Sequence, residues 1–451
     1  MNIRELQDAA VTVLGAARSG LAVATLLRSR GAGVLVSDQR PADQLYEAES
    51  DLAALGVQLE TGGHSERVFD CSLMVLSPGV PSDAPAVQEA LRRGLRVVSE
   101  VEVASWFCRS PIIAVTGSNG KTTTTTLIGR ILGDAKTKHV VAGNIGTAFS
   151  SVVLDMAEEE TAVLEISSFQ LDHCETFHPK ISVILNITED HMDRYAHSME
   201  QYASSKARVF MNQSGDDVLI YCADDPWTAD AVRRARCRRL SFSYEKVQQE
   251  GAWIEGGTMV LRIDGKRMDI IPVDQMTIRG IHNALNSMAA AIVGYLIGVN
   301  PASIRATLRN FRGVEHRLEF VRELNGVRFY NDSKATNVDS VRYALQAFAN
   351  PIILMLGGRD KGNDYTRLLD LVRGHVKAIV ALGESAQKVE SSFRESVPVH
   401  RVSSMNDAVT TAVQLAGDGD IVLLSPACAS FDWFNNYEHR GRVFKDLVHQ
   451  L

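Results

Sequence analysis

The feature that most constrains the fold is the stretch from Pro111 to Leu132, where a short apolar run leads into a glycine-rich turn, a lysine and a helix-forming segment. Ile112 to Val115 is apolar and rich in β-branched residues, as in a strand buried within a parallel sheet. Gly117 and Gly120 bracket a turn directly before Lys121. Backbone N–H groups that open a helix bind phosphate, and a lysine there reaches terminal phosphates. The stretch therefore predicts a nucleotide-phosphate loop between a strand and a helix.

This loop departs from the usual P-loop in its spacing. Only Ser118 and Asn119 separate Gly117 from the Gly120-Lys121 pair, fewer residues than the usual pattern has. The alternative, a tight turn with a solvated lysine, is disfavoured because strand, turn, lysine and helix all agree. Thr122, directly after Lys121, is placed to hold a magnesium ion.

The length of 451 residues suggests about three domains, and the 45% hydrophobic fraction is ample for their cores. A net charge of -7 means that the chain as a whole does not attract nucleic acid or an anionic membrane electrostatically. The six cysteines show no Cys-x-x-Cys spacing, which fits a reducing cytosol. Met1 to Asp8 lacks the apolar core of a signal peptide, and the longest apolar stretch, Met288 to Gly298, is too short to span a bilayer. We therefore expect a cytoplasmic protein with neither nucleic acid nor a membrane as partner.

The first hundred or so residues begin like a dinucleotide-binding βαβ unit. A strand from Ala10 is followed by a glycine turn and a helix through Arg28, and a second strand, Val34 to Ser37, ends at Asp38. An acidic residue at that distance can meet a ribose or a base. Ala17 stands where close approach to a pyrophosphate needs glycine, so the pattern favours another kind of nucleotide site over an NAD site.

A further buried strand, Leu73 to Leu76, ends in the turn Ser77-Pro78-Gly79. Ligands of open α/β sheets collect at such carboxyl ends. Residues 1–110 are thus predicted to form one nucleotide-binding domain.

The middle region places charged residues in or after buried strands. Glu165 lies within the apolar strand Ala162 to Ile166, and a buried carboxylate must be paired or bound to a cation. His191 follows the strand Ile181 to Ile187 among several acidic residues, which favours a functional over a structural role. Lys206, on the following helix, would by itself be interpreted as a solvated face residue.

Short strands and hairpin turns fill Arg238 to Pro272, a small antiparallel excursion. A helix, His282 to Leu296, comes next, and Asn283 at its beginning fits either a contact to a base or phosphate or a helix cap. A domain boundary is expected near Phe311 to His316, where a glycine breaks the pattern.

The last third alternates strand and helix again, which predicts another doubly wound layer. Its expected elements are the strands Gly326–Tyr330, Ile352–Leu356, Ala378–Leu382 and Ile421–Ser425, the helix Val338–Ala347 and a final helix from Arg442. Polar clusters follow three of the strands, at Asn331–Asn337, Gly357–Lys361 and Ser425–Phe431. Lysines and hydroxyls at one sheet edge suit a small, multiply anionic substrate. The fold class is thus α/β, with three mostly parallel sheets: a Rossmann-like domain (1–110), a P-loop ATPase-like central domain (111–313) and a Rossmann-like C-terminal domain (314–451).

The phosphate loop, Thr188 to Tyr195, His316-Arg317, Asn331 to Asn337 and Ser425 to Ser430 together resemble the Mur ligases of peptidoglycan synthesis, and in particular those that add D-glutamate. The resemblance covers the whole chain. It implies that the first domain binds the UDP end of UDP-N-acetylmuramoyl-L-alanine, the second ATP and the third D-glutamate. ATP would phosphorylate the L-alanyl carboxylate, and the amine of D-glutamate would attack the acyl phosphate. A monomer whose third domain closes over the ATP site is expected.

Site residues carried over from the family fall into four groups. The ATP group is Gly117, Ser118, Asn119, Gly120, Lys121, Thr122, Thr123, Thr124, Asn283, Arg317 and Asp332. Two Mg²⁺ ions would be held by Thr122, Glu165, His191 and Lys206, the last as a carbamate, because an ammonium cannot bind Mg²⁺. The group for the UDP substrate is Ser19, Asp38, Arg40, Ser77, Pro78, Gly79 and Asn144. The D-glutamate group is Lys334, Thr336, Lys361, Ser430 and Tyr437. Of these, Lys121, Glu165, His191 and Lys206 would be catalytic.

Two residues depart from the family pattern: Ala17 in the first glycine loop and Tyr437, where phenylalanine is expected. The sequence disfavours three other functions. A folylpolyglutamate synthase would not need a separate UDP domain. A nicotinamide-dependent oxidoreductase is disfavoured by Ala17 and by the absence of an evident hydride-transfer pair. A nucleotide-gated binding module without turnover is disfavoured by Lys121, Glu165 and His191.

Overall fold

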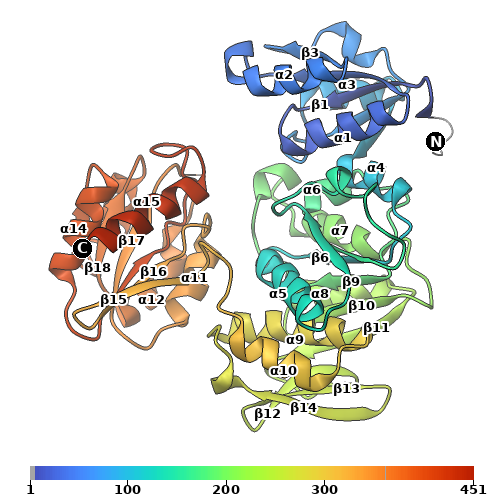
Figure 1. Cartoon of the computed structure of the whole chain (residues 1–451). Coiled ribbons are helices and arrows are strands. Elements are labelled where there is room, and N and C mark those ends of the chain that lie inside the picture. The colour runs from blue at the N-terminus through green and yellow to red at the C-terminus, as the bar shows by residue number, and fades with distance from the viewer. Residues whose placement is uncertain (1–5, 361) are drawn as a thin grey trace. The chain divides into compact units, whose positions relative to one another are not determined.

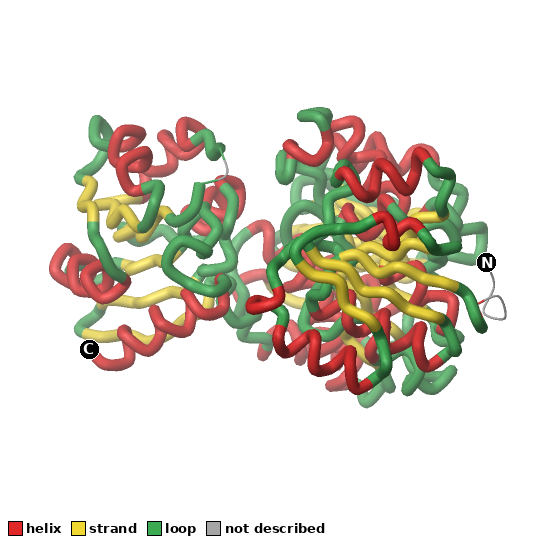
Figure 2. Tube along the Cα trace, turned by 90° about the horizontal axis from the view of Figure 1, so that it is seen from above, coloured by secondary structure: helices red, strands yellow, loops and turns green. Residues whose placement is uncertain are grey.

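The computed structural model describes residues 6–360 and 362–451. Residues up to 273 together with 285–308 form one compact unit, and residues 274–284 together with 309–451 form a second. Each unit is described by itself. Helices lie on both sides of the strands within each unit (Figure 2).

The first unit begins with a five-stranded sheet of order β3-β2-β1-β4-β5, in which every neighbouring pair is parallel. Its strands are β1 (Ala10–Leu14), β2 (Gly33–Asp38), β3 (Gln58–Thr61), β4 (Leu73–Leu76) and β5 (Arg96–Ser99), and its helices are α1 (Arg18–Ser29), α2 (Tyr46–Ala54), α3 (Pro85–Arg92) and α4 (Glu100–Phe107). Figure 1 shows these elements in colours from dark blue at β1 to cyan at α4. The predicted strand–turn–helix opening is confirmed.

A nine-stranded sheet follows, of order β14-β13-β12-β11-β10-β9-β6-β8-β7. Its strands are β6 (Ile112–Thr116), β7 (His139–Gly143), β8 (Thr161–Glu165), β9 (Ile181–Ile184), β10 (Val218–Cys222), β11 (Arg238–Ser243), β12 (Gly251–Glu255), β13 (Thr258–Ile263) and β14 (Lys266–Pro272). The helices in or after it are α5 (Lys121–Asp134), α6 (Ser168–Asp172), α7 (Met199–Ala207), α8 (Pro226–Ala231), α9 (Ile281–Leu296) and α10 (Pro301–Asn310). Only the pairings of β12 with β13 and β13 with β14 are antiparallel. The excursion predicted over Arg238 to Pro272 is therefore antiparallel only from β12 onward, because β11 pairs in parallel with both of its neighbours.

Strand β9 ends at Ile184, earlier than the predicted Ile187. Beyond it the backbone turns toward the phosphate loop: the N–H of Leu185 donates to Thr116, and the carbonyl of Asn186 accepts from Ser118. The apolar run is therefore longer than the strand because its last residues support the loop.

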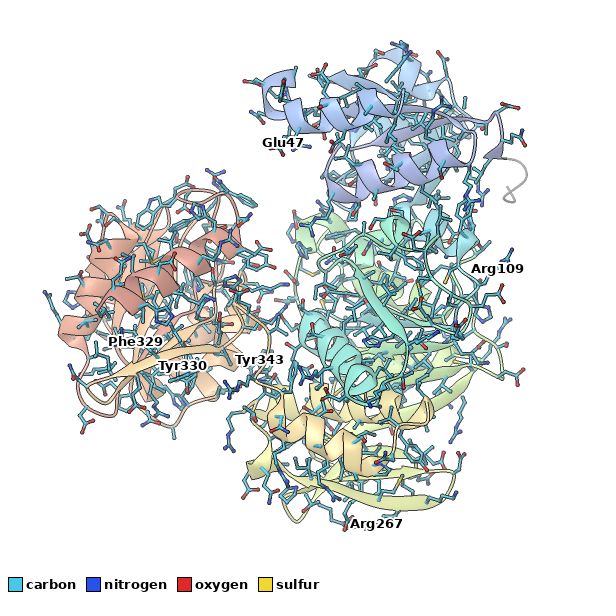
Figure 3. All side chains as sticks on the ribbon, in the orientation of Figure 1. Glu47, Arg109, Arg267, Phe329, Tyr330 and Tyr343 are labelled. Carbon is cyan, nitrogen blue, oxygen red and sulfur yellow. The ribbon has the colours of Figure 1, made fainter. Side chains whose placement is uncertain are left out.

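The second unit contains a six-stranded sheet of order β15-β16-β20-β17-β18-β19. Its strands are β15 (Glu319–Leu324), β16 (Val327–Asn331), β17 (Ile352–Gly357), β18 (Val376–Leu382), β19 (Val399–Arg401) and β20 (Ile421–Leu424), and its helices are α11 (Val338–Gln346), α12 (Leu369–His375), α13 (Ala386–Phe393), α14 (Met405–Leu415) and α15 (Tyr437–Gln450). All pairs are parallel except β15 with β16. Phe329 and Tyr330, neighbours on β16 (Figure 3), belong to different apolar clusters, because successive strand residues point to opposite faces.

The predicted start of the final helix at Arg442 is wrong. Helix α15 begins at Tyr437, because the side chain of Asn436 accepts the backbone N–H of His439 and caps an earlier turn. The α/β class with three mostly parallel sheets is confirmed.

Candidate active site

The phosphate loop lies between β6 and α5, at the carboxyl end of a fully buried strand. Gly117 has φ +152° and Gly120 has φ +86°, conformations that side-chain-bearing residues rarely adopt. Asn186 holds the loop from the neighbouring strand end: its Oδ1 accepts the N–H of Asn119 at 2.8 Å, and its Nδ2 donates to the carbonyl of Asn119 at 3.0 Å. The loop is thus fixed by the sheet before any ligand binds.

The two lysines predicted to be catalytic, Lys121 and Lys206, meet at this loop. Lys121 Nζ donates to the carbonyl oxygens of Gly117 (2.7 Å) and Ser118 (2.9 Å). Lys206 Nζ donates to the same Gly117 oxygen at 2.9 Å. Two amines on one carbonyl oxygen repel each other when both are charged, so the geometry favours one of them being neutral.

The interpretation of Lys206 as a solvated face residue is wrong, since it is only 1% exposed. The apolar side of α7 carries it inward, where its Nζ also lies 4.4 Å from the ring centroid of Tyr202. Burial foremost, and then the nearby charge of Lys121, lower the pKa of Lys206 well below its ordinary value.

Glu165 ends β8 beside the phosphate loop strand and is 2% exposed. Asn144 Nδ2 donates to Glu165 Oε1 at 3.1 Å, and the N–H of Asn144 donates to the carbonyl of Glu165 at 2.8 Å. Because β6 lies between β8 and β9, the ends of all three strands meet at one edge of the sheet. The three threonines that open α5, Thr122, Thr123 and Thr124, are buried at that edge.

His191 follows β9 and begins a short 3-10 turn, Met192–Tyr195. Its side chain is 41% exposed, and its Nε2 lies 3.7 Å from a carboxylate oxygen of Asp190. The Phe169 ring, from α6, meets the His191 ring edge-on at 4.9 Å. The histidine side chain is therefore partly exposed to solvent and also contacts an aromatic ring.

Asn144, predicted for the UDP substrate, lies beside Glu165 in the nine-stranded sheet, whereas the other residues of that group belong to the first sheet and its loops. Asp38 Oδ2 accepts the N–H of Ala16 at 2.7 Å, and both oxygens of Asp38 bond to the guanidinium of Arg40. Burial alone would raise the pKa of Asp38, but the hydrogen bonds from Arg40 and Ala16 lower it to about 2. Asp38 is thus ionised, and it fixes both the glycine turn and the arginine.

The remaining residues of that group in the first domain belong to helix α1 and to the loop that follows β4. Ser19 is in the first turn of α1, half-buried. Ser77, Pro78 and Gly79 follow β4, and the side chain of Ser77 would touch any β-carbon added to Gly15.

In the second unit, Asp332 directly follows strand β16 and is buried. Its Oδ1 accepts the N–H of Leu318 at 3.2 Å, and its Oδ2 accepts the hydroxyl of Ser425 at 2.8 Å. Burial raises the pKa of Asp332 to about 7, despite the hydrogen bond from Ser425 and the nearby charge of Arg317. Asn283, assigned with them to ATP, donates its side-chain N–H to the carbonyl of Arg279 at 2.8 Å, as a helix-end residue does.

Four of the five residues predicted for D-glutamate are described. Lys334 Nζ lies 5.1 Å from the ring centroid of Tyr437, Ser430 is buried and Thr336 is half-buried. Lys361 lies outside the described residues.

Sequence reasoning missed Arg440, a buried arginine of α15. Its guanidinium donates to Ser333 Oγ (2.9 Å), to the carbonyl of Ser333 (2.7 Å) and to the carbonyl of Cys428 (3.1 Å). It thereby ties the Asn331–Asn337 loop to the Ser425–Ser430 loop. No local pattern marks an arginine as buried; only its place one helical turn after Tyr437 could have suggested it.

Asn286 of α9 was also missed as a site residue. It is 4% exposed, and a β-carbon on Gly120 would lie 2.3 Å from its Oδ1, so its side chain packs directly on the phosphate loop. Its spacing of three residues after Asn283 places both on one helix face, a signal that the sequence did contain.

Three family models match the chain: "Mur ligase MurD-like, N-terminal domain" over residues 9–99, "Mur ligase middle domain" over 115–294 and "Mur ligase, glutamate ligase domain" over 316–428. A curated relative from Salinibacter ruber, named UDP-N-acetylmuramoylalanine--D-glutamate ligase, is 48% identical over 458 residues and covers 99% of each chain. This chain belongs to the Mur ligase family. It is accordingly an ATP-dependent ligase of the kind that forms amide bonds in peptidoglycan precursor synthesis.

Other relatives agree. The enzyme of the same name from Acidobacterium capsulatum is 46% identical, covering 98% of this chain and 97% of its own. Among solved structures, MurF from Acinetobacter baumannii has a TM-score of 0.64 at 17% identity and covers 99% of this chain and 98% of its own. A UDP-N-acetylmuramate-alanine ligase from Thermotoga maritima has a TM-score of 0.60 at 19% identity, with coverages of 98% and 99%. These structures share the fold of the chain, and the resemblance to Mur ligases is confirmed.

Within the described residues, no helix combines the length and the apolar character needed to cross a bilayer.

Proposed function

We propose that this chain joins D-glutamate to the L-alanyl carboxylate of UDP-N-acetylmuramoyl-L-alanine at the expense of ATP, through an acyl phosphate. The near-full-length identity of 48% to a relative of that name carries the proposal. The domain roles predicted from the sequence belong to it: residues 1–110 for the UDP end, 111–313 for ATP and 314–451 for D-glutamate.

The phosphate loop supports the first half-reaction. A carboxylate and a triphosphate must approach to bonding distance, and two unit charges 4 Å apart repel by about 4 kcal/mol at an effective dielectric of about 20. Lys121 and the N–H groups that open α5 supply compensating positive charge. Asn144, beside Glu165, would orient the acceptor carboxylate, whose oxygen attacks the γ-phosphorus as ADP leaves.

The second half-reaction joins the amino acid. The amine nitrogen attacks the acyl carbon, phosphate leaves and the amine loses a proton. Lys334 and Lys361 would face the carboxylates of D-glutamate, with Thr336, Ser430 and Tyr437 around them. The hydrogen bonds of Arg440 to Ser333 and Cys428 would keep the loops that carry Lys334, Thr336 and Ser430 in place.

The donor set fits Mg²⁺ in part as it stands. The hydroxyl of Thr122 and the carboxylate of Glu165 are the oxygen ligands that Mg²⁺ prefers, and His191 offers a nitrogen. Lys206 fits only as a carbamate, which needs a neutral amine, and its burial beside Lys121 favours that form. When bound, two Mg²⁺ ions would neutralise charge on the phosphates and the carboxylate.

ATP would use Gly117, Ser118, Asn119, Gly120, Thr123 and Thr124 as well as Lys121 and Thr122, and it would use Asn283, Arg317 and Asp332 of the second unit. The UDP end would use Ser19, Asp38, Arg40, Ser77, Pro78 and Gly79. We further propose that the protein is a monomer and that it works in the cytoplasm. ATP is supplied there, and the six cysteine thiols of the chain stay reduced.

The test is phosphate release from ATP with UDP-N-acetylmuramoyl-L-alanine and either D- or L-glutamate. We expect release only with both the acceptor and D-glutamate. Equal release with L-glutamate would refute the stereochemical assignment. Release with a folate acceptor in place of the UDP compound would favour the folylpolyglutamate alternative.

A further inference from the structure

The ring of Phe169 joins His191 to residues that have no assigned role in the proposed reaction. It meets the His191 ring edge-on at 4.9 Å and stacks on Tyr195 with a centroid distance of 6.2 Å. The guanidinium of Arg194 lies over the same ring at 4.1 Å from its centroid. One aromatic side chain thus contacts three residues of the segment that carries His191.

The backbone of that segment is held in an uncommon conformation. His191, Ala196 and His197 have φ of +53°, +49° and +56°, although none is a glycine. Such conformations persist only where surrounding contacts determine them. The Tyr195 hydroxyl, which donates to Asp172 at 2.9 Å, and the stack on Phe169 supply contacts of this kind.

Arg194 also reaches the first sheet of the same unit. Its Nη2 donates to the carbonyl of Gly79 at 3.4 Å, in the turn that follows β4. Its Nη1 is buried, and within the described part of the chain no atom accepts a hydrogen bond from it. A buried cationic N–H without an acceptor is unfavourable, so this group favours the arrival of an anionic oxygen near Gly79.

We propose that Arg194 is a positioning residue that couples the Ser77–Gly79 turn to His191 through the ring of Phe169. When the diphosphate of a nucleotide binds at that turn, one of its oxygens accepts a hydrogen bond from Nη1 of Arg194. The guanidinium then shifts over Phe169, and the His191 ring turns with it. The acceptor would thereby prepare the phosphoryl-transfer edge of the central sheet. This inference rests on the proposed function, in which the first sheet receives the UDP end.

The experiment follows the His191 ring in the metal-free protein. Histidine is labelled with ¹³C, the Cε1–H resonance of His191 is assigned with His191→Asn, and UDP is the probe. Calorimetry on the same samples shows when UDP is saturating. Ring-current shifts are steep at an edge-on contact, so a small rotation against Phe169 moves this resonance.

We expect saturating UDP to move the His191 resonance in the unsubstituted protein and to leave it in place in Arg194→Gln. Arg194→Lys keeps the charge but loses the planar stack, so its response should be smaller. Arg109→Gln is the matched control: Arg109 is an exposed arginine of the same unit, paired only at the surface with Glu158 (Figure 3). It should respond as the unsubstituted protein does.

Steady-state kinetics give a second readout. In Arg194→Gln we expect kcat to fall about tenfold with KM for ATP unchanged, because the lost stack acts on His191 and not on the phosphate loop. If UDP saturates the unsubstituted protein without moving His191, or moves it equally in Arg194→Gln, the coupling is refuted while the proposed function stands. If UDP does not bind at all, the role of the first sheet fails and the coupling fails with it.

Discussion

Replacing Gly120 by alanine tests how the phosphate loop depends on its backbone. Gly120 has φ +86°, and an added β-carbon would lie 2.3 Å from Asn286 Oδ1 and 3.1 Å from its Cγ. The left-handed conformation alone is unfavourable for alanine by about 1–2 kcal/mol. The steric overlap comes on top of this, and because Asn286 is buried, it cannot be relieved without moving that side chain or the loop.

Gly298→Ala is the matched control. Gly298 has φ +92°, nearly the same backbone strain, but an added β-carbon there meets nothing within 4 Å. Gly298→Ala should lose about 1–2 kcal/mol of unfolding free energy in urea, and Gly120→Ala should lose more because of its overlap with Asn286. Only Gly120→Ala should raise KM for ATP, by about 10- to 100-fold, since a displaced loop aims its N–H groups away from the phosphates. Equal KM values for ATP in the two variants would refute the role assigned to the loop backbone.

Three further predictions concern buried polar groups. Lys206→Ala should lower kcat by about a hundredfold or more, and added short carboxylates such as acetate should restore part of it in a phosphate-release assay; full activity without rescue would discard the carbamate. Arg440→Ala should lower the unfolding free energy by about 3 kcal/mol in urea titrations, because it leaves buried carbonyl oxygens of two loops without a hydrogen-bond donor. A loss below about 0.5 kcal/mol would contradict the role of Arg440 in joining the two loops. Asp332 has a folded-state pKa of about 7 against an ordinary 3.8, so the folded state holds its proton more tightly; stability should fall as pH rises from about 4 to about 7, by up to about 4 kcal/mol, and Asp332→Asn should flatten that dependence in unfolding curves of the ligand-free protein.

The sequence predicted those parts of the fold and site that local patterns determine. The strand before Gly117, the turn and the helix from Lys121 follow from a buried apolar run, two glycines and a lysine within a few residues. Local patterns also located Glu165, the last residue of β8, and Asp332, the residue after β16. Both lie at the carboxyl edge of a parallel sheet, where polar groups collect.

What the sequence could not show are contacts between segments far apart in the chain. Lys206 looks solvated on its own helix, and only the packing of α7 on the phosphate loop buries it. Arg440 is buried because two loops supply carbonyl oxygens to its guanidinium. The start of α15 was missed for a smaller reason: its cap, Asn436, comes directly after another asparagine in a polar stretch.

Phosphoryl transfer from ATP to a carboxyl group is the central step of the proposed reaction. Acceptor labelled with ¹⁸O in the L-alanyl carboxylate tests this directly, by mass spectrometry of the phosphate released with ATP and D-glutamate. An acyl phosphate predicts that each released phosphate carries one oxygen from the acceptor. Release of unlabelled phosphate during amide formation would contradict it.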